Sequence, residues 1–236
     1  MRRAGRVVAE MHAAILEALT PGVTGLELDR LAAGVIARRG ATSNFLGYMG
    51  YPNVIQVSPN SVVLHGIPNA VPLEEGDIVS VDCGAIVDGY HGDAAFSAGV
   101  GSIAPSAQRL IDTTRQALEA GLATLAPGSR LGDLGHAVEA TATRAGYSVV
   151  RGYVGHGIGR AMHEEPDVPN HGRRGKGYRV AQGEVFAVEP MLCAGQAKLF
   201  VGDDGWTVST RDGSLAAHWE HTVAVTANGP EILTAL

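Results

Sequence analysis

Four acidic residues occupy matching positions in two related stretches of this 236-residue sequence. Asp82 closes a segment that reads as a turn followed by an apolar strand, and Glu189 closes a second segment of the same pattern. The next predicted strand of each stretch supplies another acid, Asp93 in the first and Glu220 in the second. Two halves that face each other would bring these four carboxylates to one centre. Bound cations would then be needed to compensate their negative charges.

Burial makes this cluster costly unless something compensates it. Asp82 and Glu189 follow runs that are apolar enough to be buried on both faces of a sheet. Any one acid at the end of a strand, taken alone, is more simply read as pointing to solvent. Two buried unit charges about 4 Å apart repel by about 4 kcal/mol at an effective dielectric of about 20. Protonation or metal binding must therefore relieve four acids that meet.

The imidazole most suited to such a site is His156, in the motif Gly155–Gly159. Its flanking glycines let the backbone approach closely and aim the ring inward. Sites rich in oxygen with one imidazole suit divalent Mn, Fe, Co or Zn. Four carboxylates and one histidine are more ligands than one catalytic ion uses, and four negative charges balance two divalent cations. The motif partly resembles a dinucleotide-binding loop, but no helical pattern follows it.

The same repeat organises the elements that position these residues. The stretch from Pro21 to Gly40 matches the stretch from Pro127 to Gly146, although chance likeness between amphipathic helices would also imitate this part of the repeat. The sequence predicts helices at 4–19, 24–39, 105–123 and 131–145, a loop with short strands at 41–70, a hairpin of strands 78–87 and 90–100, and strands at about 184–192 and 217–226. Helices followed by strands, twice over, favour an α+β fold with helices covering one face of an antiparallel sheet.

Composition narrows the class of protein. The chain is 45% hydrophobic and 18% charged, with a formal net charge of -6, which argues against a dedicated nucleic-acid-binding protein. No stretch approaches the roughly 20 apolar residues of a membrane span. Glu10 and His12 interrupt any signal-peptide pattern near the start, and Cys83 and Cys193 do not suggest a disulfide framework. We therefore expect a cytoplasmic monomer.

Five motifs resemble the metal motifs of the type I methionine aminopeptidases, in the same order and over essentially the whole chain. They are Val81–Gly84, His91–Asp93, Gly155–Gly159, Val188–Met191 and His218–Thr222. The resemblance implies the duplicated pita-bread α+β fold, an antiparallel sheet with helices on its outer face around a central dimetal site. It also implies one catalytic domain, residues 1–236, made of two pseudo-symmetric halves at about 1–104 and 105–236.

The resemblance implies a role for each ligand. Asp82 binds one ion, His156 and Glu189 bind the other, and Asp93 and Glu220 bridge the two. The implied activity is that of a methionyl aminopeptidase, which removes the N-terminal methionine of nascent proteins and peptides with a hydroxide held by two divalent ions (Co, Mn, Fe or Zn) as the nucleophile.

Three residues are implied to act in the reaction. Glu189 handles the proton of the water, His163 donates a hydrogen bond to the developing oxyanion, and His65 holds the scissile amide or its leaving nitrogen. Outside the family motifs, His12, His136 and His171 are expected at the surface.

The implied pocket for the first residue of the substrate departs from bacterial relatives at three positions. Its residues are Phe45, Tyr48, Tyr51, Gln56, His65, Met162, His163 and Trp206. Relatives often carry cysteine in place of Phe45 and Gln56, and an aromatic residue in place of Met162. Phe45 would make the pocket smaller, and the flexible side chain of Met162 would let its wall adapt to different ligands. The Gln56 amide needs a hydrogen-bond partner if it is buried. Methionine is still expected as the first residue, with less strict selection.

Two other functions fit parts of the pattern. A related dimetal aminopeptidase of Xaa-Pro type would share the metal core, but such enzymes usually carry a sizeable N-terminal domain. A non-catalytic binding protein of the same fold predicts missing ligands, whereas all five are present. The basic segment Arg173–Arg179 is either a solvated loop or a transient contact with the ribosome near the emerging nascent chain.

Overall fold

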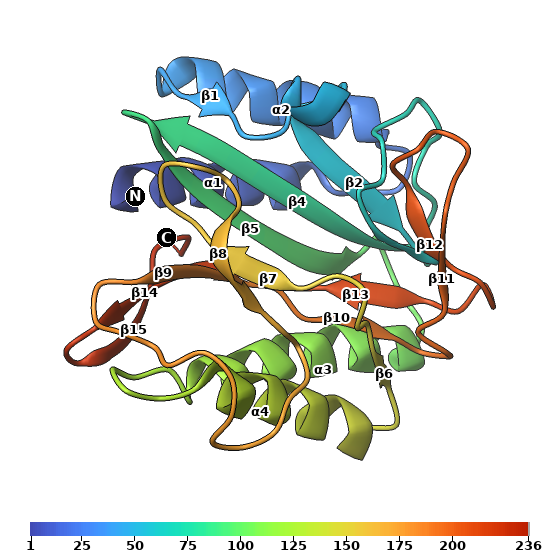
Figure 1. Ribbon diagram of the computed structural model, residues 1–236. Coiled ribbons are helices and arrows are strands. Elements are labelled where there is room, and N and C mark those ends of the chain that lie inside the picture. The colour runs from blue at the N-terminus through green and yellow to red at the C-terminus, as the bar shows by residue number, and fades with distance from the viewer. Residues whose placement is uncertain (236) are drawn as a thin grey trace.

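A computed structural model describes residues 1–235 and places helices on two opposite sides of a set of antiparallel strands (Figure 1). Helices α1 (Arg2–Ala18) and α2 (Gly25–Arg38) lie on one side. Helices α3 (Pro105–Leu122) and α4 (Leu131–Arg144) lie on the other. Each pair therefore covers the strands of its own half from outside, as the α+β prediction requires.

The helix boundaries follow local sequence signals. Thr24 caps α2 and accepts a hydrogen bond from the Glu27 N–H at 3.2 Å, while the Glu27 carboxylate accepts one from the Thr24 N–H at 2.8 Å. This confirms the predicted capping box. Helix α3 starts at Pro105, whose missing N–H costs nothing in the first turn. The four predicted helices are confirmed to within two residues at each end.

In the first half, β4 (Ile78–Val87) forms the predicted hairpin with β5 (Tyr90–Gly99). On its other edge β4 pairs with β1 (Thr42–Ser43) and β2 (Ile55–Pro59). In the β4–β5 register Asp82 stands opposite Ala95, and Asp93 stands opposite Gly84. The two acids are thus diagonal neighbours on one face of the sheet.

The second half supplies a five-stranded antiparallel sheet, a three-stranded one, and two strands of another three-stranded sheet that is completed by β3 of the first half. The larger sheet has the order β15 (Gly229–Ile232), β14 (His221–Thr226), β9 (Val185–Val188), β7 (Gly155–Gly157), β8 (Glu164–Val168). The smaller sheets are β13 (Ala216–His218), β10 (Met191–Cys193), β6 (Ser148–Val149), and β11 (Leu199–Val201), β12 (Val208–Thr210), β3 (Val62–Leu64). A short 3-10 helix, η1, spans Tyr48–Gly50.

The two predicted strands of the second half are each broken in two. The stretch 184–192 is interrupted after β9 at Glu189 and Pro190, and 217–226 is interrupted after β13 at Trp219 and Glu220. Pro190 has no N–H to donate to a ladder, so β10 leaves the β9 sheet and pairs instead with β13 and β6. The prediction of continuous strands is wrong here, and the two acids sit at the breaks.

Matched turns give the two halves similar backbone conformations. Gly22 and Gly128, each after a proline, have φ of 96° and 91°, and Gly76 and Gly183 have φ of 100° and 93°. These left-handed values favour glycine. The paired sequence segments therefore adopt paired turns at equivalent places.

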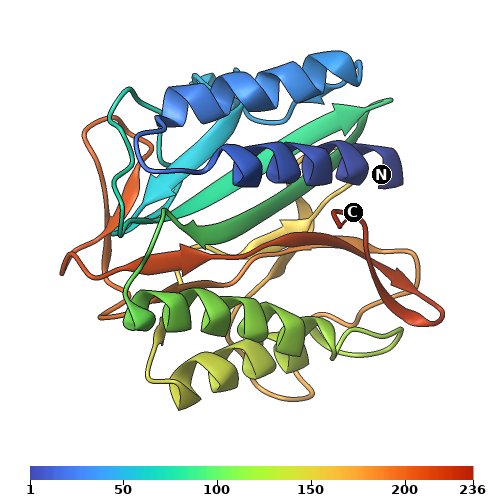
Figure 2. The same ribbon diagram turned by 180° about the vertical axis from the view of Figure 1, so that it is seen from behind.

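Each half has its own apolar core. One cluster draws its buried residues from Val7 to Val100, and another draws them from Ala107 to Val225 together with Ile78. Trp219 packs against both clusters. Figure 2 shows β13 and β14 running between the two helical pairs, with the N- and C-terminal ends of the chain on the same side.

His12 differs from expectation. It is half-buried rather than a surface residue, and its ring stacks edge-on against Phe96 at 4.8 Å. Its Nε2 donates to the carbonyl oxygen of Ala94 at 3.0 Å. Helical spacing alone did not mark this face of α1 as the one that meets β5.

Candidate active site

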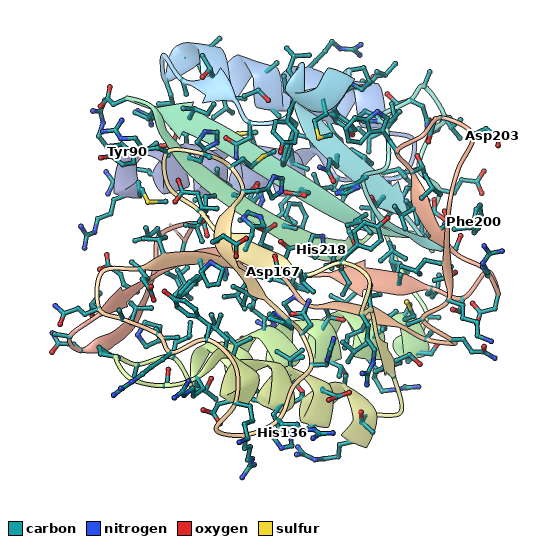
Figure 3. The ribbon with its side chains drawn as sticks, in the orientation of Figure 1. Tyr90, His136, Asp167, Phe200, Asp203 and His218 are labelled. Carbon is teal, nitrogen blue, oxygen red and sulfur yellow. The ribbon has the colours of Figure 1, made fainter. Side chains whose placement is uncertain are left out.

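A cavity of about 320 Å³ lies between the two halves and gathers every residue that the sequence analysis assigned to the site. It has an acidic end, with the four carboxylates and His156, and an apolar end around Phe45, Tyr51 and Met162. Three further residues contribute to its wall: Met49 and Leu64, which lie outside the five metal motifs, and His218, which flanks Glu220 in one of them. Figure 3 shows His218 well inside the molecule, while His136 lies at its outer edge.

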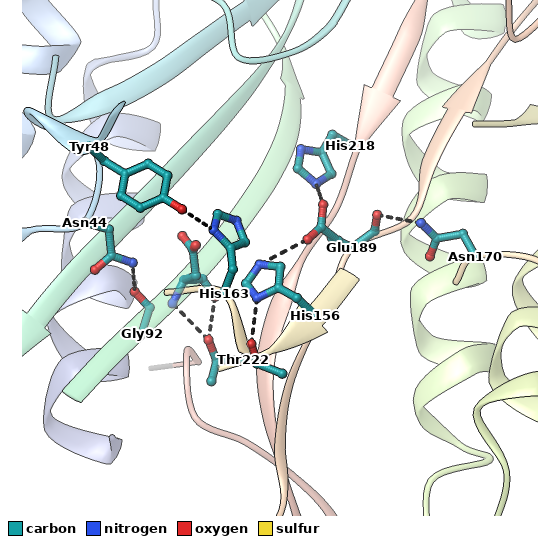
Figure 4. Close-up of polar contacts among 11 residues, drawn as sticks. Asn44, Tyr48, Gly92, His156, His163, Asn170, Glu189, His218 and Thr222 are labelled. Atoms are coloured by element: carbon teal, nitrogen blue, oxygen red, sulfur yellow. Dashed lines mark hydrogen bonds and ion pairs between the residues drawn. The ribbon is translucent and has the colours of Figure 1, made fainter. Parts of the chain in front are cut away.

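At the acidic end, side chains from distant segments converge. Asp93, His156 and Glu220 each offer a ligand atom, and these atoms all lie within 4.8 Å of one another. The His156 Nε2 lies 3.4 Å from Glu189 Oε1, and Figure 4 marks this contact with a dashed line. Asp82 faces the same cavity from β4. All but the half-buried Asp82 are buried.

The backbone ties the two halves together beside these ligands. Ala95 of β5 and Glu220 exchange both backbone hydrogen bonds, at 3.3 and 2.9 Å. The Thr222 hydroxyl accepts from the Asp93 N–H at 2.9 Å and donates to the Asp93 carbonyl at 2.7 Å. These bonds hold an acid of the first half against an acid of the second.

Two of the carboxylates have a buried oxygen without the hydrogen-bond donor that would help to keep it charged. Within residues 1–235, Asp82 Oδ1 and Asp93 Oδ1 are buried and have no hydrogen-bond partner. Burial, above all, raises the pKa of Asp82 to about 7. Burial and then the charge of Asp82 raise the pKa values of Asp93 and Glu189 well above their usual range. Orphaned oxygens on crowded acids are what bound cations would satisfy, so the donor set fits divalent metal ions.

His156 is prepared to join such a site as a neutral ligand. Its Nδ1 lies 2.9 Å from the carbonyl oxygen of Gly157, which can only accept, so Nδ1 carries the proton. The lone pair is then on Nε2, the atom that faces Glu189. Burial lowers the pKa of His156 to about 4, which keeps the ring neutral. Metal-binding histidines commonly donate their other ring N–H to a backbone carbonyl, which fixes the tautomer in this way.

Two supporting side chains carried no signal in the sequence. Asn170 is fully buried, and its amide donates to the Glu189 carbonyl at 3.0 Å. Asn44 donates to the Gly92 carbonyl at 3.1 Å, a bond drawn in Figure 4, and its Oδ1 lies 3.0 Å from His91 Nδ1. Both hold the backbone next to an acid, a task that only the folded chain reveals.

At the mouth and the apolar end, aromatic rings surround two histidines. The Tyr48 hydroxyl lies 2.9 Å from His163 Nδ1, and the His163 ring lies 4.3 Å from that of His156. His65 has a left-handed φ of 59° and packs edge-on against Tyr153 and Trp206. A non-glycine residue in this region is strained, and such strain clusters at functional sites.

Comparison with known proteins agrees with this geometry. The model of metallopeptidase family M24 matches residues 1–227. Methionine aminopeptidase 1 of Mycobacterium tuberculosis is 52% identical, over 99% of this chain and 91% of that protein. The crystal structure of methionine aminopeptidase from Rickettsia prowazekii superposes with a TM-score of 0.97 at 44% identity, covering 99% and 95% of the two chains.

A more distant likeness shows the breadth of the fold. Prolidase from Pyrococcus furiosus superposes with a TM-score of 0.79 at 20% identity, and the match covers all of this chain but 63% of that one. At this identity the likeness concerns the pita-bread fold alone. The near-complete matches to the closer relatives are more specific, and from them the chain belongs to the methionine aminopeptidases of metallopeptidase family M24.

Proposed function

We propose that this protein hydrolyses the peptide bond after an N-terminal methionine, with Asp82, Asp93, His156, Glu189 and Glu220 holding two divalent metal ions. The observation that carries the proposal is the convergence of four carboxylates and one neutral imidazole at the end of a cavity, where Asp82 and Asp93 each have a buried oxygen without a hydrogen-bond partner. The substrate is the N-terminus of a peptide or nascent chain. Within this set, Asp93 and Glu220 would serve both ions, as the family resemblance implies. They come together from opposite halves, since the backbone of Glu220 pairs with that of Ala95 and the backbone of Asp93 bonds to the Thr222 hydroxyl.

Several residues around the cavity have roles in the proposed hydrolysis. When bound, paired divalent ions supply Lewis-acid chemistry and lower the pKa of water from about 15.7 to about 7. Glu189 accepts the proton of the attacking water. His163, at the mouth, donates to the oxyanion, and Tyr48 orients its ring through Nδ1. His65 holds the scissile amide nitrogen from the opposite wall.

The apolar end suits the first side chain of the substrate. Phe45, Tyr51 and Met162 form a buried cluster with Trp206 packed against it. A long, flexible apolar side chain such as methionine fits a wall of this kind. Tyr48, Gln56, His65 and His163 complete this pocket in the proposal.

The proposal includes the organisation of the chain. Residues 1–236 are one catalytic domain with two pseudo-symmetric halves, about 1–104 and 105–236. The separate apolar cores and the matched glycine turns support this division.

The proposal also covers the cellular setting of the reaction. Cys83 and Cys193 are buried free thiols, as suits a reducing cytoplasm. None of the helices within residues 1–235 is both long and apolar enough to cross a membrane. We expect a monomer. The exposed segment Arg173–Arg179 is the candidate for a transient ribosome contact, although it bonds to the start of α4 and contributes nothing to the cavity wall.

The test is hydrolysis of Met-Ala-Ser by the purified protein, with chelator and after restoring Mn, Co, Fe or Zn one at a time. We expect activity to vanish with chelator and to return with at least one ion. Ala-Ala-Ser and Leu-Ala-Ser measure the preference for methionine, and Met-Pro-Ser tests the Xaa-Pro alternative. Equal turnover of all first residues would contradict the assignment to methionine, and no turnover with any ion would favour a binding protein.

A further inference from the structure

Gln56 is a buried amide in the cavity wall that the proposed reaction does not use. It lies on β2 opposite Asp82 of β4 and is only 7% exposed. Its Oε1 accepts a hydrogen bond from the His65 N–H at 3.0 Å. Because a backbone N–H can only donate, the atom that faces it must be the amide oxygen. The NH₂ group is therefore the free end of the side chain.

That free end is available to the cavity. Within the described residues 1–235, Gln56 Nε2 has no hydrogen-bond acceptor, yet it is not among the partnerless atoms that are sealed from solvent. Gln56 contributes to the wall of the same cavity as the apolar cluster of Phe45, Tyr51 and Met162. A donor beside an apolar wall discriminates strongly between a ligand that offers an acceptor and one that does not.

We propose that Gln56 extends the first-residue specificity of this site from methionine to methionine sulfoxide. The thioether sulfur of methionine is a weak acceptor, whereas the sulfoxide places an oxygen acceptor on the same atom of the side chain. The inference rests on the proposed function, because it takes the apolar end as the pocket for the first side chain. The reaction is the same hydrolysis: the peptide bond breaks, water gives its hydroxyl to the carbonyl carbon and a proton to the leaving amine, and methionine sulfoxide is released.

Gln56 also supports the backbone of His65, and the test must separate this structural role from the recognition of the sulfoxide. Through Oε1 it holds the backbone of His65, whose φ of 59° is strained. Any replacement of Gln56 is therefore expected to lower the turnover of every substrate. The informative quantity is a ratio between two substrates that share the reaction and differ only in the acceptor.

The experiment compares Met-Ala-Ser, norleucine-Ala-Ser and methionine sulfoxide-Ala-Ser with the metal-loaded wild type and Gln56→Met. Norleucine has the length of methionine and no acceptor. We expect the wild type to cleave the sulfoxide peptide with kcat/KM within about tenfold of the methionine peptide. In Gln56→Met the ratio of sulfoxide to norleucine turnover should fall about tenfold, the loss of one hydrogen bond.

Ser58→Ala is the matched control. The Ser58 hydroxyl accepts from the Gly66 N–H at 3.1 Å, the same kind of bond to the next residue along, but Ser58 is not part of the cavity wall. This variant should lower all three substrates alike and leave the ratio within twofold. The inference is overturned if the wild type cleaves Met-Ala-Ser but not the sulfoxide peptide, or if Gln56→Met leaves the ratio unchanged. Failure to cleave Met-Ala-Ser would instead overturn the proposed function, and this inference with it.

Discussion

The two halves of the molecule deliver their acids to the same cavity by different means. In the first half, Asp82 and Asp93 lie within two unbroken ten-residue strands, β4 and β5. In the second half, Glu189 and Glu220 lie at breaks, between β9 and β10 and between β13 and β14. The regular strands carry aspartate, the shorter side chain, and the interrupted strands carry glutamate, the longer one. A repeated sequence thus preserves the chemistry at a position while the backbone around it changes.

The largest expected effect tests whether the halves contribute equally to metal binding. Asp93→Asn and Glu220→Gln each remove one carboxylate and keep the shape of the side chain. We expect each to lower kcat/KM for Met-Ala-Ser by at least about 100-fold, because changes even behind metal ligands cost about 10- to 100-fold. Metal content by elemental analysis should fall in both.

Glu75→Gln, an exposed acid of the first half, is the control and should keep its metal and activity. Should only one of the two ligand variants lose metal, the picture of bridging acids from opposite halves would be wrong.

Core variants test whether the halves unfold as one unit. Leu28 of α2 and Leu134 of α4 are fully buried, one in each apolar cluster. Leu28→Ala and Leu134→Ala are each expected to lower the free energy of unfolding by about 2–5 kcal/mol. If the halves form one cooperative domain, calorimetry will show a single transition that both variants shift. Two transitions, each sensitive to one variant, would show independent halves.

His12 offers a smaller effect that belongs to the first half alone. Burial lowers its pKa to about 4 from the ordinary value of 6.5. Between these values the unfolded chain binds the proton and the folded chain does not, so stability falls as pH drops from about 6.5 to about 4. We expect up to about 3 kcal/mol from this group. His12→Gln, which can still donate to the Ala94 carbonyl, should remove that part of the slope in chelator-treated protein. An unchanged slope would contradict the buried neutral histidine.

Helix capping gives the smallest difference between the halves. Thr24 caps α2 with a complete box, whereas Arg130 stands at the equivalent position of α4, and Asp133 takes the place of Glu27. Thr24→Ala should destabilise the protein by about 1 kcal/mol, since it removes the hydroxyl that accepts from the Glu27 N–H. Arg130→Ala should cost less, because this side chain offers no hydroxyl to the helix. Equal losses in chemical denaturation would argue against the capping difference.

Much of the site was predictable because its signals are local. The matched acids, the glycines around His156 and the capping box at Thr24 all rest on residues close in sequence, and the structure places the assigned side chains in one cavity. The strand breaks were not predictable in the same way. Val185–Val188 reads as the start of a longer strand, and only the pairing of β10 with β13 shows where it ends.

The residues that support the site could not be predicted, because their partners are distant in the sequence. Asn170 and Asn44 act on backbone groups far away in sequence, so their types suggest polar loops until the fold brings those groups near. The position of His12 in a helical repeat is compatible with a surface residue and with a packed one. Only the packing of α1 on β5 shows that it is covered.

By itself, the amino-acid order determined the pairing of the halves, the helices and the set of acids with one imidazole, because these depend on residue type and on short-range periodicity. Tertiary structure alone decided the contacts that hold the acids of one half against the other, where the strands break, which end of the Gln56 amide is free, and which nitrogen of His156 carries the proton. Each of these depends on distances between segments up to a hundred or more residues apart, or on the direction of a donor, and no local pattern encodes either.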